Sequence, residues 1–468
     1  MGDLGIEWQA TYAEAERDKP DRQFFRYERS GLGADGTPIF QFSQSGQSNE
    51  RSFEELDDES QSVGVDFSLP LQLVSMETTL KWGVSYTDRE RDSSFRRFRF
   101  QTDFSRNNLE DVLGFAPDVV LRDANIGPGL FELREVTQPT DNYTAEESNT
   151  AFYLTADMRI GEKLQLSVGA RREDSDIETT TFDRSDPTQQ IVADLEDDDV
   201  LPALNVTYAL TDSLQLRAGY SKTLNRPDLR ELSPAPFIEP EERFVIIGNP
   251  NLKTAEIDNF DLRFEWYWSS LDNLQLALFY KDFKDPIESF VQFGGSNGGA
   301  RSFQNALGAE NQGIEVQVRS GLGRFGDALT DFFVKLNAAY IDSEVEVPDK
   351  RAADHQEPRA RRAVALRHQF PAGLRQPGTA DRERVAVHIA DDRINAVGVR
   401  GLPHAIEKSA PRLDFNYRQV VSLFGSEWTV KFRALNLLDP DYEIKRGSII
   451  ERGYKLGRTV QLGLDYQF

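Results

Sequence analysis

The clearest signal along the chain is an alternation of apolar and polar residues with a period of two. Between Asp3 and Tyr12 the apolar side chains occupy the even positions, and polar residues or glycine occupy the odd ones. Such a pattern predicts a strand with one apolar face. Strict alternation over at least eight residues returns at 62–69, 163–170, 213–220, 427–434 and 459–468. Looser alternation marks further segments at 76–86, 152–160, 204–210, 260–268, 274–280, 314–318, 332–340 and 413–417. We therefore expect about sixteen to eighteen strands.

The connections between the predicted strands alternate between short and long. Short spacers lie at 161–162, 211–212 and 271–273, and long polar ones at 174–199, 225–256 and 294–311. Short turns at one end and long loops at the other are typical of outer-membrane barrels. A soluble β-sandwich is the alternative, but its strands average about 5–6 residues. The runs here reach about ten, close to the 9–11 that cross a bilayer at a tilt. The prediction is an all-β fold, a transmembrane antiparallel β-barrel of the outer-membrane type.

The composition fits a barrel once this pattern is known. The chain has 54 basic and 78 acidic residues, a net charge of −24, and only 39% apolar residues. A barrel tolerates such polarity because only alternate residues face lipid. The acidity, without a stripe of lysine and arginine, excludes nucleic acid as a partner. The absence of cysteine excludes disulfides and thiolate metal sites.

Aromatic residues cluster near the ends of predicted strands, where interfacial girdles place them. The clusters are Trp266-Tyr267-Trp268, Phe279-Tyr280 with Phe283, and Tyr466 with Phe468. Core aromatics of a soluble sheet are the alternative interpretation.

Five short motifs follow one another in a fixed order. They are a strand and Arg-Pro loop entry at 214–229, Gly-Asn-Pro-Asn-Leu-Lys at 248–253 with Glu256 and Asn259, Tyr-Lys-Asp-Phe-Lys-Asp-Pro-Ile at 280–287, Asn-Gln-Gly-Ile-Glu at 311–315, and Asn-Leu-Leu-Asp at 436–439 with Tyr442. Together, over about residues 150–468, this series resembles the C-terminal barrel of TonB-dependent outer-membrane receptors. The alternating last strand, ending on Phe468, is similar to the ends of other outer-membrane barrels.

Most of these motif residues have architectural roles. Pro227 and Pro250 lack a backbone donor, so they end ladders at loop entries. Asn and Asp in tight turns supply side-chain hydrogen bonds and tolerate left-handed backbone. For Arg226 and Lys253 we expect pairing with carboxylates in the lumen.

The resemblance implies a receptor in the bacterial outer membrane for energy-coupled uptake of a scarce ligand of siderophore, vitamin or saccharide type. The implied partners are outer-membrane lipid, the inner-membrane TonB complex and a small extracellular ligand, and no enzyme activity is implied. A plugless passive or structural barrel, or a non-functional fragment, is the alternative.

The resemblance also implies a plug domain, an energy-coupling box, a signal peptide and about 22 strands. The sequence offers none of the first three, and its start lacks the basic and apolar regions of a signal peptide. No run approaches the roughly 18 consecutive apolar residues that a membrane helix needs. We expect residues 1–468 to be an N-terminally truncated barrel with about 16–18 of about 22 strands, or a smaller barrel with an empty lumen.

Residues 350–390 depart from the rest. They contain eight Arg, nine Ala and three of the four His, with a single aromatic residue, and the alternation almost disappears. A basic loop that captures an acidic ligand is one interpretation. We favour a frameshifted stretch, because out-of-frame GC-rich codons give this composition.

No catalytic, cofactor-binding or metal-binding residue is predicted, and the ligand-binding residues stay unknown. The histidines at 355, 368, 388 and 404 lack the spacing of a zinc site. Acidic runs at 54–59 and 196–199 are expected to be solvated loop tips rather than divalent-cation sites. The glycine-rich run 294–299 is expected to be a flexible loop, since it follows no Rossmann strand.

Overall fold

Most of the chain is strand in the computed structural model. It describes residues 3–43, 49–73, 76–102, 109–183, 186–237, 245–269, 272–293, 299–327, 332–346, 361–374, 383–390, 392–396, 403–423 and 426–467. The wall is built from β1 (Gly5–Phe24), β4 (Glu50–Leu73), β5 (Met76–Thr102), β6 (Phe131–Glu135), β7 (Tyr143–Ile160), β8 (Leu164–Phe182), β9 (Gln190–Thr211), β10 (Leu214–Asn225), β13 (Ala255–Tyr267), β14 (Asn273–Lys284), β17 (Gly308–Gly321), β18 (Phe332–Glu346), β19 (Arg361–Leu374), β20 (Glu383–Ala390), β23 (Arg412–Leu423), β24 (Ser426–Leu435) and β27 (Thr459–Gln467).

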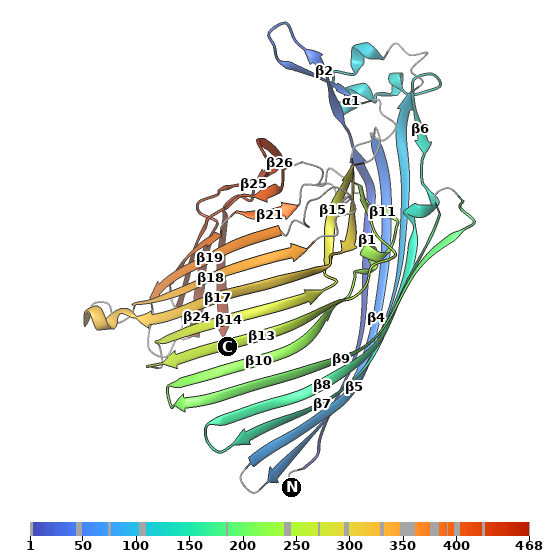
Figure 1. Cartoon of the computed structure of the whole chain (residues 1–468). Coiled ribbons are helices and arrows are strands. Elements are labelled where there is room, and N and C mark those ends of the chain that lie inside the picture. Colours follow the sequence, from blue (N-terminus) through green and yellow to red (C-terminus); the bar gives the residue numbers. More distant parts are fainter. Residues whose placement is uncertain are drawn as a thin grey trace, which may run out of the picture.

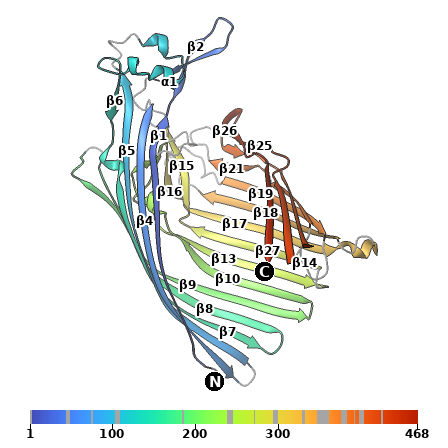
Figure 2. The same ribbon diagram turned by 180° about the vertical axis from the view of Figure 1, so that it is seen from behind.

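The wall strands form one antiparallel sheet in chain order. Ladders run from β1 to β4, onward through β5, β7, β8, β9 and β10, and at the far side from β23 to β24 and β27. The sheet has seventeen strands, including the short β6, as the alternation predicted. It curls strongly (Figures 1 and 2). Within the described residues no ladder joins β27 to β1, so these two strands are its edges. The predicted all-β, outer-membrane type of wall is confirmed.

The connections separate into a short-turn end and a long-connection end. At the short-turn end lie the N-terminus of β1, the turn after β7 at 161–163 and the short 3₁₀ helix η5 (Leu322–Phe325). The long connections contain β2 (Tyr27–Leu32), β3 (Pro38–Phe42), η1 (Glu110–Val112), α1 (Pro117–Val120), η2 (Asp123–Asn125), η3 (Pro139–Asp141), α2 (Leu229–Leu232), β11 (Pro236–Phe237), β12 (Val245–Ile247), β15 (Ile287–Phe293), β16 (Gly299–Asn305), β21 (Arg393–Ala396), β22 (Ala405–Glu407), β25 (Asp441–Arg446) and β26 (Ile449–Lys455). The described helices are all short, and none has the length and apolar character to cross a membrane.

Residues 174–199 are not a long loop, and that prediction was wrong. β8 continues to Phe182 and β9 starts at Gln190, and the two remain paired from Leu164 opposite Tyr208 to Phe182 opposite Gln190. Beyond the apolar band the outer face of β8 carries Arg172, Asp174, Asp176 and Glu178 in place of apolar residues, so the hydrophobic period vanishes while the backbone ladder persists. The acidic runs 54–59 and 196–199 lie on such extensions of β4 and β9, which corrects their prediction as loop tips.

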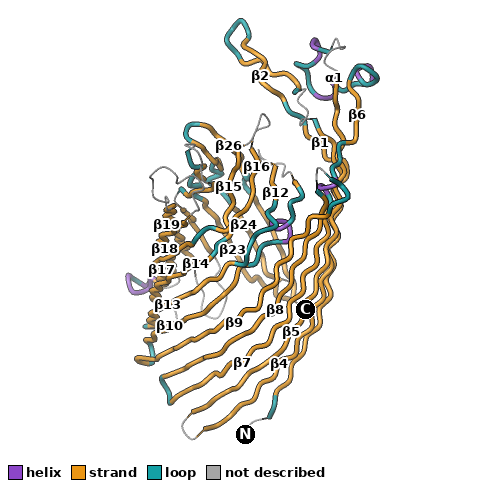
Figure 3. Tube along the Cα trace, turned by 45° about the vertical axis from the view of Figure 1, so that its right-hand side comes forward, coloured by secondary structure: helices purple, strands orange, loops and turns teal. Residues whose placement is uncertain are grey.

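The alternation sorts side chains to two faces. On β14, Leu274, Leu276 and Leu278 point to one face, and Gln275 and Ala277 to the other. Paired residues share a face, so Leu278 lies beside Leu262 and Ile314, whereas Ala277 lies beside Arg263 and Glu315. The apolar face is exposed, for example 45% at Leu278. Figure 3 shows the curl of the sheet. Arg230 of the short helix α2, in the β10–β13 connection, donates to Glu54 on the polar face at 3.3 Å, so the polar face is the enclosed one. The apolar face is therefore outside, toward lipid, and the polar face lines the lumen.

Tyrosines mark the boundary of the outer apolar face toward the long connections. They are Tyr12, Tyr86, Tyr220, Tyr280 and Tyr340, and the outward residue two positions further is charged each time, namely Glu14, Asp88, Lys222, Asp282 and Asp342. The hydroxyl of Tyr220 donates to Asp258 Oδ1 at 2.8 Å. An apolar ring with a polar tip suits this interface.

Other predicted aromatics divide between the faces. Trp266 and Trp268 lie at the short-turn end with ring centroids 4.9 Å apart, and Tyr466 lies 4.8 Å from Trp428. Phe279 and Phe283 are odd-numbered residues of β14 and face the lumen, so their assignment to the girdle was wrong. Phe468 lies outside the described residues.

The turn motif at 436–439 behaves as its residue types predict. Asn436 and Asp439 have φ values of 56° and 48°, in the left-handed region. Asn436 Nδ2 donates to the Gly457 carbonyl at 2.8 Å, and Asp439 Oδ1 accepts from the Gly457 N–H at 3.1 Å. These side chains close the connection between β24 and β27.

The anomalous stretch 350–390 contains two wall strands despite its weak alternation. β19 pairs with β18, and β20 pairs with β19 and β23. Residues 347–360 and 375–382 lie outside the described part. A gap in the hydrophobic pattern therefore does not mean a gap in the wall.

We propose that part of this stretch is translated out of frame, and we predict compensating single-base insertions or deletions near codons 350 and 388. Sequencing of the coding DNA, with the frame compared against intact relatives, checks this. A clean frame shared by relatives with the same peptide would contradict it.

Candidate functional site

Charged side chains gather on the lumen face just beyond the apolar band, at the long-connection end. We call this group the lumen cluster. It comprises Arg17 and Lys19 on β1, Glu54 and Asp58 on β4, Arg89 and Arg91 on β5, Glu147 on β7, Arg171 and Glu173 on β8, and Arg226, Asp228 and Arg230 from the β10–β13 connection. Each wall residue occupies an inward position of its strand, so the cluster follows directly from the alternation.

Glu54 is the most enclosed carboxylate of the cluster, with 8% of its surface exposed. Lys19 Nζ lies 3.1 Å from its Oε2, Arg230 Nη2 lies 3.3 Å from its Oε1, and Arg17 also donates to it. Burial alone raises the pKa of a carboxyl, but Lys19 and the two arginines outweigh it and hold the pKa of Glu54 below its usual range. Glu54 is therefore a structural anion that ties three chain segments together.

Asp58 holds a second group of cations. Arg89 donates from Nε and Nη2 to its two oxygens, both at 2.9 Å, and Arg91 Nε donates to Oδ2 at 2.6 Å. Arg89 Nη1 also lies 3.6 Å from Glu147 Oε2. Burial acts to raise the pKa of Asp58, but hydrogen bonds from Arg89 and Arg91 lower it overall. This arrangement links β4, β5 and β7 across the inner surface.

Glu173 is the carboxylate that pairs with Arg226, which confirms the lumen pairing predicted for this arginine. Arg226 Nη1 donates to Glu173 Oε2 at 2.8 Å, and Arg171 Nε donates to Oε1 at 2.6 Å. Lys253 does not follow the prediction. Its backbone exchanges hydrogen bonds with the Asn305 side chain, and among the described residues its ammonium has no ion pair.

The segment Arg226–Leu232, which we call the strap, enters the lumen after β10. Its helix α2 begins with a capping box, in which Asp228 Oδ1 accepts from Arg230 N at 2.9 Å and Glu231 Oε2 accepts from Asp228 N at 3.0 Å. This pattern of Asp followed three residues later by Glu starts a helix. Burial raises the pKa of Glu231. The single turn is short because Pro234 follows its end.

Two motifs that are separate in sequence meet at the strap. Gly248 packs closely against the C-terminal end of the strap: an added Cβ would lie 2.6 Å from Glu231 O in the strap and 2.1 Å from the O of Ser233, the residue that follows it. The next residue, Asn249, donates its backbone N–H to Glu231 O at 2.6 Å. The Arg-Pro entry and the Gly-Asn-Pro segment are therefore one structural unit.

A third motif joins this unit through Asn305. Asn305 Nδ2 donates to Asp285 O at 2.7 Å and to Lys253 O at 2.9 Å. Asn249 Nδ2 donates to Phe303 O at 3.0 Å. Asn305 and Phe303 lie outside every recognised motif, so sequence reasoning missed them. A side-chain amide between two loops has no periodic signature.

One side of the strap packs against an apolar core. Leu229 and Leu232 are almost fully buried and belong to a cluster with Tyr143, Ala145, Ile177, Ala193, Ala235 and Leu252. Full burial of a leucine contributes about 1.5–3 kcal/mol. The strap therefore combines an apolar side against the wall with a charged side in the lumen cluster.

A cavity of about 440 Å³ opens between the strap and the wall. Its lining includes Arg89 and Glu147 from the wall, and Arg226, Asp228 and Glu231 from the strap. Both signs of charge border it. Such a cavity offers hydrogen-bond donors and acceptors to a polar ligand entering from the long-connection end.

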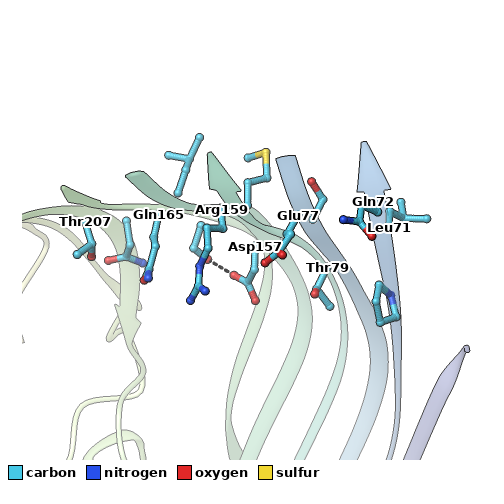
Figure 4. A pocket seen from close by; sticks show the side chains of 14 residues that line it. Leu71, Gln72, Glu77, Thr79, Asp157, Arg159, Gln165 and Thr207 are labelled. Carbon is cyan, nitrogen blue, oxygen red and sulfur yellow. Dashed lines mark hydrogen bonds between the residues drawn. The ribbon is translucent and has the colours of Figure 1, made fainter. Parts of the chain in front are cut away.

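A second hollow, of about 750 Å³, follows the lumen face near the short-turn end. Figure 4 shows Thr79, Asp157, Arg159 and Gln165 projecting to the same side of the sheet. Asp157 is held by Lys81 Nζ at 2.9 Å and by Ser167 Oγ at 2.6 Å. The inner wall is thus polar at both ends of the sheet.

In the part of the chain that the structure describes, no group of three or more His, Asp or Glu residues is arranged to hold a metal ion. His355 lies outside the described residues, and the side chains of His368 and His388 are not described. His404 directly precedes β22.

Acid is expected to loosen the lumen cluster. Because Glu54, Asp58 and Glu173 have pKa values below their usual range in the folded chain, their pairing stabilises the fold above about pH 4 and is lost as the pH falls through the lowered values. The urea midpoint of unfolding, compared at pH 7, 5 and 3, measures this. We expect the midpoint to change little between pH 7 and 5 and to fall at pH 3. A comparable fall already at pH 5 would contradict the assignment.

Comparison with known proteins shows the family of the chain. The family model "TonB dependent receptor-like, beta-barrel" matches residues 7–380. The chain belongs to this family. Its members are receptors and transporters of the outer membrane rather than enzymes.

Solved structures share the fold at low sequence identity. The ferric citrate transporter FecA in its unliganded form superposes with a TM-score of 0.59 and 14% identity, over 98% of this chain and 58% of FecA. The ferric-catecholate import receptor Fiu of Escherichia coli K12 has a TM-score of 0.58 and 13% identity, over 99% and 62%. The siderophore receptor PiuA of Acinetobacter baumannii has a TM-score of 0.54 and 13% identity, over 98% and 72%.

One curated relative matches a smaller part of the chain. The heme/hemopexin utilization protein C of Haemophilus influenzae is 25% identical over an alignment of 211 residues, which covers 38% of this chain and 27% of that protein. The chain thus spans about a quarter of this relative and 58% of FecA.

Proposed function

We propose that this chain is the barrel wall of a TonB-dependent receptor that takes up a scarce ligand across the outer membrane. The observation that carries the proposal is the family match over residues 7–380, together with a lumen lined by paired charges beneath long connections. Binding and gating are the chemistry that such a site can perform. The long connections would capture the ligand, and the lumen cluster would receive it.

A ferric siderophore is the first candidate ligand. The solved relatives are named for ferric citrate, a ferric catecholate and siderophores. Heme is the second candidate, from the name of the curated relative. The mixed charges around the 440 Å³ cavity suit a polar chelate better than an apolar molecule.

Uptake of radioactive iron tests the proposal. The complete gene is expressed in a host that lacks its own ferric receptors, with and without a functional TonB protein, and supplied with ferric citrate, a ferric catecholate or heme. We expect uptake of one of these that disappears without TonB. Equal uptake in both hosts would instead support a passive barrel, and no uptake of any probe would contradict a role in iron import.

A further inference from the structure

We infer that the strap is an electrostatic latch: a segment that opens as a unit from the lumen while the wall stays folded, and whose closed position depends on its ion pairs with three wall strands as well as on its packing. This goes beyond ligand uptake, because it concerns how one segment moves.

The three ion pairs are spread over the wall. Arg226 reaches Glu173 on β8 at 2.8 Å, and Arg230 reaches Glu54 on β4 at 3.3 Å. Asp228 lies between them, with Oδ1 3.9 Å from Arg91 Nη1 on β5. β4, β5 and β8 are not all neighbours, since β7 lies between β5 and β8. The charged side of a seven-residue segment therefore reaches three strands, β4, β5 and β8, across the intervening β7.

The closed strap leaves hydrogen-bonding capacity unused. Arg226 Nε and Nη2 are buried, and neither has a partner among the described protein atoms. A buried donor without a partner costs about 1–3 kcal/mol. The closed form is therefore stabilised less than its ion pairs suggest, and opening returns these two donors to solvent.

The surroundings allow the strap to move. Pro227 lacks an N–H, so it makes no ladder bond that opening would break. On one side of the strap is the cavity of about 440 Å³, whose lining includes Pro227, Asp228 and Leu229. The other side is fixed by the two leucines and by the contacts with Gly248 and Asn249. In addition, the Arg230 guanidinium lies over the Phe237 ring, 4.1 Å from its centroid.

The carboxylates of the wall keep ion pairs within the wall when the strap opens. Asp58 keeps Arg89 and Arg91, Glu54 keeps Arg17 and Lys19, and Glu173 keeps Arg171 when the strap leaves. No wall carboxylate is left without a cation, so the strap opens without leaving a lone buried charge behind.

Amide hydrogen exchange of the full chain in detergent micelles tests the latch. The reporters are four amides that donate to strap carbonyls: those of Glu231 and Leu232 donate to Asp228 O, that of Ser233 to Leu229 O, and that of Asn249 to Glu231 O. For Arg226→Gln we expect all four to exchange about tenfold faster, with the same factor, because one opening event exposes them together. Exchange in β7 and β8 should not change.

The matched control is Arg172→Gln. Arg172 makes a two-bond ion pair with Asp198, at 2.9 and 2.7 Å, but on the outer face of β8. It should leave the four reporters unchanged. Asp228→Asn is the conservative second variant, since Asn preserves the N-cap but removes the charge facing Arg91; a smaller acceleration is expected.

Salt separates a latch from a merely packed segment. Raising the ionic strength should speed exchange of the reporters in the wild type and less in Arg226→Gln. If Leu229→Ala accelerates exchange while Arg226→Gln and salt do not, packing holds the strap and the inference is wrong. It is also wrong if wall amides accelerate together with the strap. Neither outcome depends on which ligand is transported.

Discussion

Replacing Leu278 with arginine should destabilise the folded barrel by about 2 kcal/mol, because a charge at the lipid face costs about 2–4 kcal/mol at the bilayer midplane and less toward the interface. Leu278 lies among Leu262 and Ile314 of the neighbouring strands, and all three are exposed on the apolar face. The measurement is urea unfolding from lipid vesicles, with the folded fraction read from heat-modifiable gel migration.

The adjacent residue supplies the control. Ala277 points into the lumen and lines hollows bordered by Arg263 and Glu315. Ala277→Arg should change the stability by less than about 1 kcal/mol, since its side chain enters a polar space. A membrane wall requires lipid on one face of β14 and water on the other. Equal losses of stability for the two variants would contradict this difference.

The second large effect is expected at Gly248. A methyl group there would meet the backbone carbonyls of Ser233, Glu231 and Arg230 at 2.1, 2.6 and 2.7 Å, and none of these atoms can rotate away. Gly248→Ala should therefore destabilise the packing of the strap against residues 248–249 by roughly 2–3 kcal/mol, which is in the range for overpacked sites. Exchange of the Asn249 amide measures the loss.

Gly308→Ala is the comparison for this change. A Cβ at Gly308 would lie 3.5 Å from Phe283 O, an ordinary van der Waals contact. The alanine should fold and protect Asn249 as the wild type does. Similar exchange of Asn249 in both variants would contradict the close packing of Gly248 on the strap.

The two-residue period predicts the wall well, because lipid on one side and water on the other impose it on every strand. Where the outside is water, the period disappears. The sequence therefore places the end of β8 too early and the start of β9 too late, and it assigns the acidic runs to loops although they lie in the paired strands β4 and β9. A backbone ladder continues without any hydrophobic pattern.

The lumen cluster could be predicted only in part. The pairing of Arg226 with a lumen carboxylate follows from a buried loop entry that carries a guanidinium. The choice of Glu173 does not, since it depends on the register of β8 and on where the strap turns. Contacts such as Asn305 with Asp285 O join loops that are distant in sequence and have no period to reveal them.

The membrane-facing orientation of the sheet is the central claim, and a cysteine scan along 274–281 tests it most directly. The chain has no native cysteine, so each position can carry one fluorophore in lipid vesicles. Lipids with a nitroxide in the acyl chain should quench positions 274, 276 and 278, and aqueous iodide should quench 275, 277 and 281. Quenching by iodide at every position, with none by the lipid nitroxide, would contradict the account.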